Sequence, residues 1–83
     1  MSKRLFVGSL AWGTTDQTLK SHFEQAGAVE SASVIMDKMS GRSKGFGFVE
    51  MGGDADASAA IEKLNGSELD GRKIVVSEAR PKA

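Results

Sequence analysis

The stretch KGFGFVEM, residues 44–51, places two phenylalanines two positions apart within a run of strand character. Because side chains of a strand alternate between the two faces of its sheet, Phe46 and Phe48 share one face. Val49 and Met51 take the opposite face and are typical residues of a protein interior. The two aromatic rings therefore lie on the face that remains, and the neighbouring elements decide whether anything covers it.

Three further strands are predicted around this aromatic strand. The first is residues 4–9, RLFVGS, a short hydrophobic run closed by Gly and Ser. The second is roughly residues 29–36, where apolar and polar side chains alternate. The polar, turn-rich segment DKMSGRSKG, residues 37–45, predicts an exposed loop between two antiparallel strands. A turn at residues 69–72 leads into the last strand, residues 73–77.

Two helices are predicted between these strands. The first follows a threonine N-cap at position 14 or 15 and ends at Gly27. The second follows an aspartate cap at position 54 or 56 and ends at Asn65-Gly66. Each helix carries a single apolar stripe, so each has one face to bury. The residues of the two stripes are Leu19, Phe23, Ala26, Ala57, Ala60, Ile61 and Leu64.

The order β-α-β-β-α-β predicts the α+β class, as a ferredoxin-like four-stranded antiparallel sheet with two helices on one face. We expect one domain over residues 1–83, with its core at about residues 3–80. The helices leave the other face of the sheet to solvent, and Phe6, Phe46 and Phe48 lie there. The residues expected under the helices are Leu5, Val7, Val34, Val49, Met51, Ile74 and Val76.

Composition excludes several classes of protein. A length of 83 residues with 40% hydrophobic content supports one small core. The chain has no cysteine and one histidine, so we expect neither a metal site nor another cofactor. No apolar run approaches the roughly 20 residues that cross a bilayer, and no apolar leader follows the initial MSKR. We therefore expect a soluble, monomeric, cytoplasmic protein.

Aromatic rings on an open sheet face indicate a flat ligand. An exposed phenylalanine forgoes about 1.5–3 kcal/mol of burial, and three together form a hydrophobic patch. Single-stranded nucleic acid has flat bases and a charged backbone, and each base stacked on a ring contributes roughly 1–3 kcal/mol. The basic residues Lys38, Arg42 and Lys44 precede the aromatic strand, although acidic and basic residues balance at 11 each.

The sequence resembles the RNA recognition motif family. Residues 44–51 are similar to its RNP1 motif at every position but the last, and LFVGSL, residues 5–10, is similar to its RNP2 motif. The resemblance runs from about residue 3 to residue 80, and it is greatest to small bacterial single-motif proteins or to the motif of glycine-rich RNA-binding proteins. Two departures are Ser9, where Asn is frequent, and Met51, where an aromatic residue is frequent.

The resemblance implies sequence-tolerant binding of single-stranded RNA, and stacking would also admit single-stranded DNA. It implies that Phe6 and Phe48 stack on bases, that Phe46 packs against sugars and that Lys44 pairs with a phosphate. Main-chain groups just beyond the last strand are expected to touch base edges. The complete predicted RNA-binding set is Phe6, Phe46, Phe48, Lys44, Arg42, Arg4, Ser77, Ala79 and Arg80.

Two other functions use the same fold. A protein-protein adaptor would use the same open face, and its affinity would respond less to salt than RNA affinity does. A small hydrolase of the acylphosphatase type has the least support, because the single Asn65 is placed as a helix stop and no Ser or Thr has a plausible His base beside it. We therefore predict a protein that is not an enzyme. Trp12 either plugs the end of the core, which we favour, or offers a fourth stacking ring.

Overall fold

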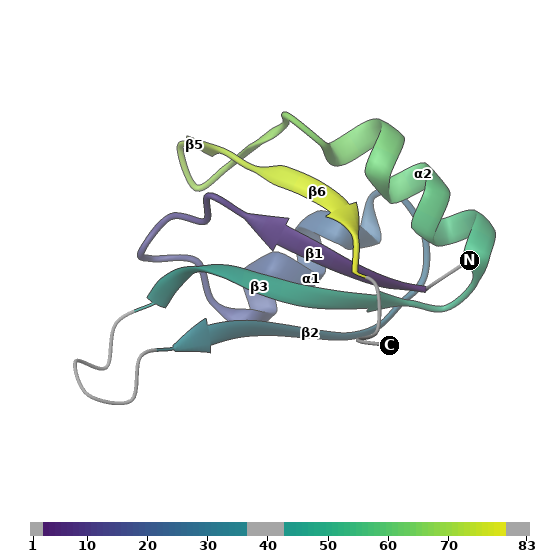
Figure 1. Cartoon of the computed structure of the whole chain (residues 1–83), viewed down its shortest axis with the longest axis horizontal. Coiled ribbons are helices and arrows are strands. Elements are labelled where there is room, and N and C mark those ends of the chain that lie inside the picture. The colour runs from purple at the N-terminus through teal and green to yellow at the C-terminus, as the bar shows by residue number, and fades with distance from the viewer. Residues whose placement is uncertain (1–2, 37–42, 80–83) are drawn as a thin grey trace.

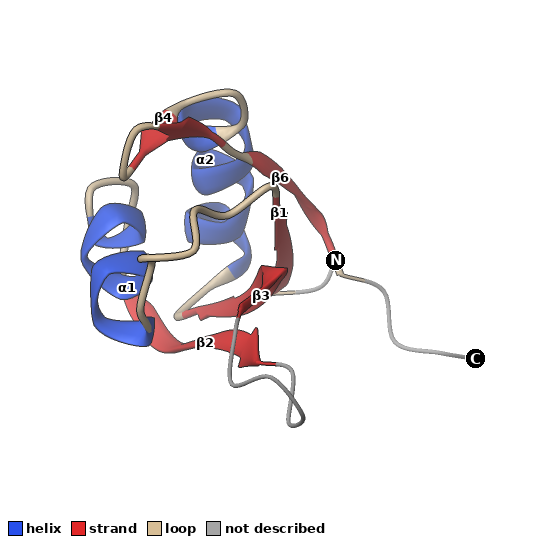
Figure 2. Ribbon diagram, turned by 90° about the vertical axis from the view of Figure 1, so that its left-hand side faces the viewer, coloured by secondary structure: helices blue, strands red, loops and turns tan. Residues whose placement is uncertain are grey.

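Four antiparallel strands form the main sheet, in the order β2-β3-β1-β6. The structure is a computed structural model that describes residues 3–36 and 43–79. Figure 1 shows α1 behind β1 and β3, and Figure 2 shows both helices on one side of the sheet. The predicted ferredoxin-like α+β fold is confirmed. The elements are β1 (Arg4–Gly8), α1 (Asp16–Glu24), β2 (Val29–Met36), β3 (Ser43–Met51), α2 (Asp54–Leu64), β4 (Glu68–Leu69), β5 (Arg72–Lys73) and β6 (Val75–Glu78).

The core lies between the sheet and the helices. The strand residues predicted to face the helices are all buried, and Ile61 of α2 is only half-buried. Burying a large aliphatic or aromatic side chain contributes about 1.5–3 kcal/mol, so this layer supplies most of the favourable free energy of folding. The buried apolar residues are Leu5, Val7, Leu10, Leu19, Phe23, Val34, Val49, Met51, Ala57, Ala60, Leu64, Leu69, Ile74 and Val76.

The helix ends differ in part from the prediction. Thr15 is the N-cap of α1, where its Oγ1 accepts from the Thr18 N–H at 3.2 Å. The helix ends at Glu24, earlier than predicted, because the Ala26 N–H turns back to the Phe23 carbonyl at 3.0 Å. The predicted aspartate cap of α2 is wrong. Gly53 occupies the cap position. The aspartates lie in the first turn, where the positive end of the helix dipole stabilises their negative charge.

A small hairpin precedes the last strand, where we predict only a turn. Strands β4 and β5 pair around Asp70 and Gly71, which have φ values of 52° and 80°. Positive φ at both central residues is the mark of the tight hairpin turn that Asp-Gly favours. Thr14 is buried and its Oγ1 donates to Asp70 Oδ2 at 2.8 Å, so the β1–α1 connection is tied to this turn.

Gly47 of β3 lies close to the backbone of β2. A Cβ atom at this position would collide with the Ser33 carbonyl oxygen and lie 3.1 Å from the Val34 Cα. Both obstacles are backbone, so they move only if the pairing of the two strands opens. We expect Gly47→Ala to lower the free energy of unfolding by about 2 kcal/mol, as measured by urea denaturation.

Gly13→Ala is the matched control for this substitution, because no atom lies within 4 Å of the position that its methyl group would take and its φ is unexceptional. Its free energy of unfolding should stay near that of the wild type. Equal denaturation midpoints for the two variants would show that β2 and β3 have room to separate at Gly47.

His22 lies on the helix side of the molecule, half-buried against Ser67. Its Nε2 is 2.9 Å from Ser67 Oγ, and that hydroxyl donates to the Leu64 carbonyl at 2.6 Å. The hydrogen of the Ser67 hydroxyl is thus directed at the Leu64 carbonyl. The Nε2–H of His22 therefore donates to Ser67 Oγ. Ser67 thus has a histidine beside it that the sequence does not reveal, because the two residues are 45 positions apart.

Stability should depend on the protonation of His22. Burial lowers the pKa of its imidazole below 6.5, and the opposing effect of Asp70 is smaller. The unfolded chain therefore binds the proton more readily than the folded chain does, so stability is lost as pH falls through 6.5 and levels off below the folded-state pKa. Melting temperatures measured from about pH 7.5 to about pH 5.5 should fall in the wild type and fall less in His22→Gln. The same decrease in both proteins would exclude His22 as its source.

Candidate nucleic-acid interface

Strand register brings three phenylalanine rings together on the face opposite the helices. Phe6 of β1 lies directly across from Phe48 of β3, and Gly8 lies across from Phe46. The ring centroids are 5.7 Å apart for Phe6 and Phe46, 5.9 Å for Phe6 and Phe48, and 6.1 Å for Phe46 and Phe48. All three rings are half-buried. We call this cluster the aromatic triad. It presents ring surface to solvent instead of filling the core.

Glycine at position 8 leaves room for one of these rings. A Cβ atom there would lie 3.1 Å from the edge of the Phe6 ring. Gly8 also pairs with Val75 of β6, whose side chain is 49% exposed. Val75 therefore extends the apolar surface beside the triad. The alternation of buried Ile74 and Val76 around it is the sequence signal that could have identified it.

Arg4 adds positive charge to the same face. Its guanidinium carbon lies 4.7 Å from the centroid of the Phe48 ring, in a cation–π arrangement. Such a contact contributes about 0.5–1 kcal/mol at an exposed site, whereas a base stacked on the ring contributes about 1–3 kcal/mol. Stacking of a base on the Phe48 ring would therefore be the stronger of the two interactions.

The other predicted contact residues have different positions. Ser77 is exposed and lies across from Phe6 on the open face. The N–H of Ala79 donates to the Arg4 carbonyl at 2.9 Å, so this main-chain donor is used within the sheet. Lys44 belongs to β3 by its backbone, but its side chain lies outside the described part of the structure. Arg42 and Arg80 lie outside the described residues. Their contacts with RNA stay predictions.

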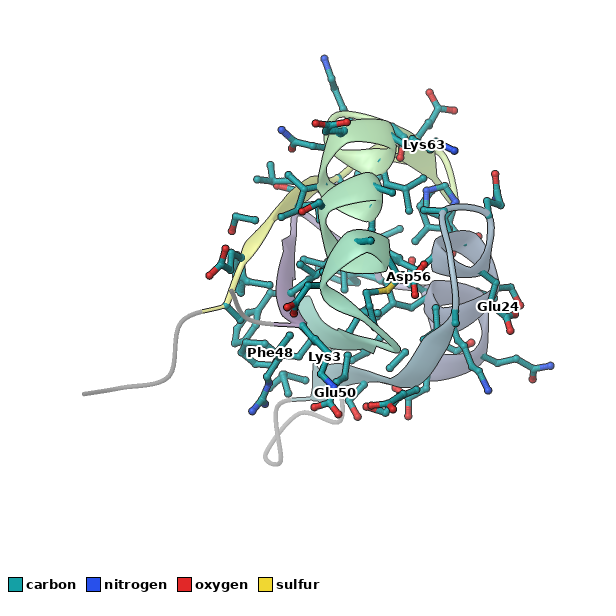
Figure 3. All side chains as sticks on the ribbon, turned by 90° about the vertical axis from the view of Figure 1, so that its right-hand side faces the viewer. Lys3, Glu24, Phe48, Glu50, Asp56 and Lys63 are labelled. Carbon is teal, nitrogen blue, oxygen red and sulfur yellow. The ribbon has the colours of Figure 1, made fainter. Side chains whose placement is uncertain are left out.

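A shallow hollow of about 230 Å³ lies on the β2 side of the triad, and the sequence patterns above predict little of it. Figure 3 shows Phe48 and Glu50 at the same end of the sheet. The period-two alternation of residues 31–35 is the signal that could have placed the serines and Ile35 here. The lining residues are Arg4, Ser31, Ser33, Ile35, Phe48 and Glu50.

Trp12 does not plug the core, so the packing role that we favoured is wrong. Its side chain is 67% exposed, and Leu10, only 1% exposed, fills that end of the core instead. A role as a fourth stacking ring stays a prediction. Ser9, which follows β1, has a φ of 59°. This value lies in the left-handed region, where Asn is better tolerated than Ser. The departure at this position thus affects the turn after β1 and not the triad.

Within residues 3–36 and 43–79, no group of three or more His, Cys, Asp or Glu side chains could hold a metal ion. In the same residues, no helix combines the length and apolar character needed to cross a membrane.

A sheet covered by helices on one face and carrying an aromatic triad on the other defines a small α+β module with an open sheet face. The sequence model of the RNA recognition motif matches residues 5–75. The chain therefore belongs to the RNA recognition motif family.

Curated relatives include longer proteins. Glycine-rich RNA-binding protein 2, mitochondrial, of Arabidopsis thaliana is 48% identical over 85 residues, which cover 100% of this chain and 54% of that protein. The 29 kDa ribonucleoprotein, chloroplastic, of the same species is 53% identical over 76 residues, which cover 92% of this chain and 22% of that protein. The chain thus spans about half of one relative and less than a quarter of the other.

Solved structures share the fold closely. The crystal structure of RNA binding protein PG1 matches with a TM-score of 0.87 and 47% identity, over 98% of this chain and 100% of that one. The structure of the Rna15 RRM with bound RNA (GU) matches with a TM-score of 0.85 and 25% identity, over 98% of this chain and 86% of that one.

The expected cytoplasmic location is contradicted by the names of the relatives. Relatives that are about half identical to this chain are named as chloroplastic or mitochondrial proteins. The physical reason is that compartment is set by targeting segments that receptors read, and the composition of a folded module carries no such address.

Proposed function

We propose that this chain binds short single-stranded RNA on the open face of its sheet. The observation that carries the proposal is the aromatic triad, with ring centroids 5.7–6.1 Å apart on the two central strands. Phe6 and Phe48 stack on bases and Phe46 packs against sugars. Arg4 and the basic residues Lys44, Arg42 and Arg80 contact phosphates. Ser77 contacts base edges, and Ala79 does so through its main-chain carbonyl, because its N–H is bonded to the Arg4 carbonyl.

Single strands fit this surface better than a duplex does. Bases in a duplex are already stacked on each other, whereas the rings need bases that are free to stack on them. The sheet has room for about two to four nucleotides. Single-stranded DNA should bind by the same stacking, because a ring does not contact the 2′-hydroxyl.

Several observations support RNA as the ligand. The relatives at 48% identity or more include proteins named as RNA-binding proteins and ribonucleoproteins, and one structural neighbour holds RNA (GU). An adaptor function would use the same face, but no observation favours it. We also propose that residues 1–83 act as one domain and as a monomer.

Catalysis is not part of the proposal. A serine activated by His22 would donate its hydrogen to the imidazole. Ser67 Oγ instead donates to the Leu64 carbonyl at 2.6 Å. The His22–Ser67 contact therefore has the polarity of a structural hydrogen bond.

Fluorescence anisotropy with a labelled RNA decamer of mixed sequence tests the proposal. We expect micromolar affinity for the single strand and at least about tenfold weaker binding to a duplex of the same length. Each phosphate contact contributes about −0.7 to the slope of log affinity against log salt. With the four basic residues named above on phosphates, the slope is about −2.8, so a fourfold rise in salt should weaken binding about fiftyfold. Absence of binding, equal affinity for the duplex, or salt-independent binding would overturn the proposal.

A further inference from the structure

We propose that the hollow beside the triad is a guanine-selective subsite in which the Glu50 carboxylate accepts from the base. The inference rests on the proposed RNA binding and adds a base preference to it. The hollow lies on the open face over β2, β3 and β1, and all of its lining side chains belong to the described residues.

The strand register places an acceptor beside the stacking ring. Phe48 and Glu50 are two residues apart in β3, so their side chains share the open face about 7 Å apart along the strand. Across β2, Ser33 lies opposite Phe48 and Ser31 lies opposite Glu50. A base stacked on Phe48 therefore has one edge directed along β3 toward the carboxylate and another toward the serine hydroxyls.

The chemistry of a carboxylate selects among the bases. Its two oxygens only accept hydrogen bonds, and they pair best with two adjacent donors. Guanine offers such a pair, the N1–H and the exocyclic N2 amino group on its Watson–Crick edge. Adenine and cytosine place one amino donor next to a ring-nitrogen acceptor, and uracil places one N–H between two carbonyls. These acceptors would face the carboxylate and be repelled.

Glu50 places a negative charge on the face proposed to bind RNA, which is itself negatively charged. A carboxylate repels phosphates, so its position in the lining of the hollow favours contact with base donors. Arg4 lies directly opposite Glu50 on β1 and reaches over the Phe48 ring. Its positive charge offsets the repulsion, and Glu50 is half-buried, which limits the orientations of its side chain.

The test uses uridine hexanucleotides that carry a single guanosine at each position in turn. We expect one or more positions at which guanosine raises affinity for the wild-type protein about tenfold over uridine. Replacing that guanosine by inosine removes only the exocyclic amino group and should weaken binding about fivefold. This comparison is made with unaltered protein, so it does not depend on the folding of a variant.

Glu50→Gln then tests the carboxylate itself. The amide keeps the size of the side chain but loses the charge and one acceptor, so the guanosine-to-inosine ratio should fall to about one or two. Glu62→Gln on α2 removes the same charge from an exposed site away from the open face and should leave the ratio unchanged.

The outcomes separate the two proposals. Binding of all hexanucleotides with similar affinity would overturn the guanine subsite and leave RNA binding intact. A guanosine preference that survives unchanged in Glu50→Gln would also overturn the subsite, because another group would then supply the selectivity. Failure of every hexanucleotide to bind would overturn RNA binding and the subsite together.

Discussion

Phe48→Ala should lower the affinity for single-stranded RNA by about 5-fold to 150-fold, the equivalent of roughly 1–3 kcal/mol of lost base stacking. Phe48 is half-buried and contacts Phe6 and Phe46 on the solvent side of the sheet. Its ring therefore presents surface to a ligand at small cost to the core. Phe6→Ala should have an effect of similar size, because the two rings lie across from each other at 5.9 Å.

The measurement is fluorescence anisotropy with the same single-stranded RNA for each variant. Phe48→Tyr is the matched control, because it keeps the aromatic ring and should retain affinity near that of the wild type. Phe48→Ala should also keep most of the stability of the fold, as judged by urea denaturation. Wild-type affinity in Phe48→Ala would show that the bases do not stack on this ring.

Phe23→Ala should have the opposite pattern of effects. Phe23 of α1 is fully buried, so its removal leaves a cavity and should lower the free energy of unfolding by about 3–5 kcal/mol. That is a large part of the roughly 5–15 kcal/mol that stabilises a typical domain. Molecules of this variant that remain folded should bind RNA as the wild type does, because Phe23 lies in the core, on the opposite side of the sheet from the triad.

Urea denaturation with and without saturating RNA checks this second prediction. The denaturation midpoint of Phe23→Ala should fall far more than that of Phe48→Ala. A small stability loss in Phe23→Ala together with a large one in Phe48→Ala would reverse the assignment of the two faces of the sheet.

Much of this fold could be predicted because its elements carry clear periodicities. The alternation in β3 and the apolar stripe of α1 each depend on residues close in sequence, so they are visible without coordinates. The β4–β5 hairpin was missed because each of its strands has only two residues, although Asp70-Gly71 is a recognisable turn signal. The cap of α2 was misassigned because Gly53, with no side-chain oxygen, occupies a position where aspartate is common.

The aromatic triad could be predicted for the same reason, whereas the hollow beside it could be predicted only in part, because alternation places Ser31, Ser33 and Ile35 on one face but does not show which β3 residues they lie opposite. Its lining depends on how β2 pairs with β3, and that register shifts between Val29 and Ser31 and again between Val34 and Met36. No local pattern records such shifts. The exposure of Trp12 was likewise hidden, because a loop has no periodicity that shows which way a side chain points.

The most direct test of RNA binding on the aromatic triad is an NMR measurement of contacts between isotope-labelled protein and single-stranded RNA. We predict intermolecular contacts from base and sugar protons to the rings of Phe6, Phe46 and Phe48, with amide shifts concentrated in β1, β3 and β6. Contacts from RNA to the helix side around His22, with the signals of the three rings unchanged, would contradict the account.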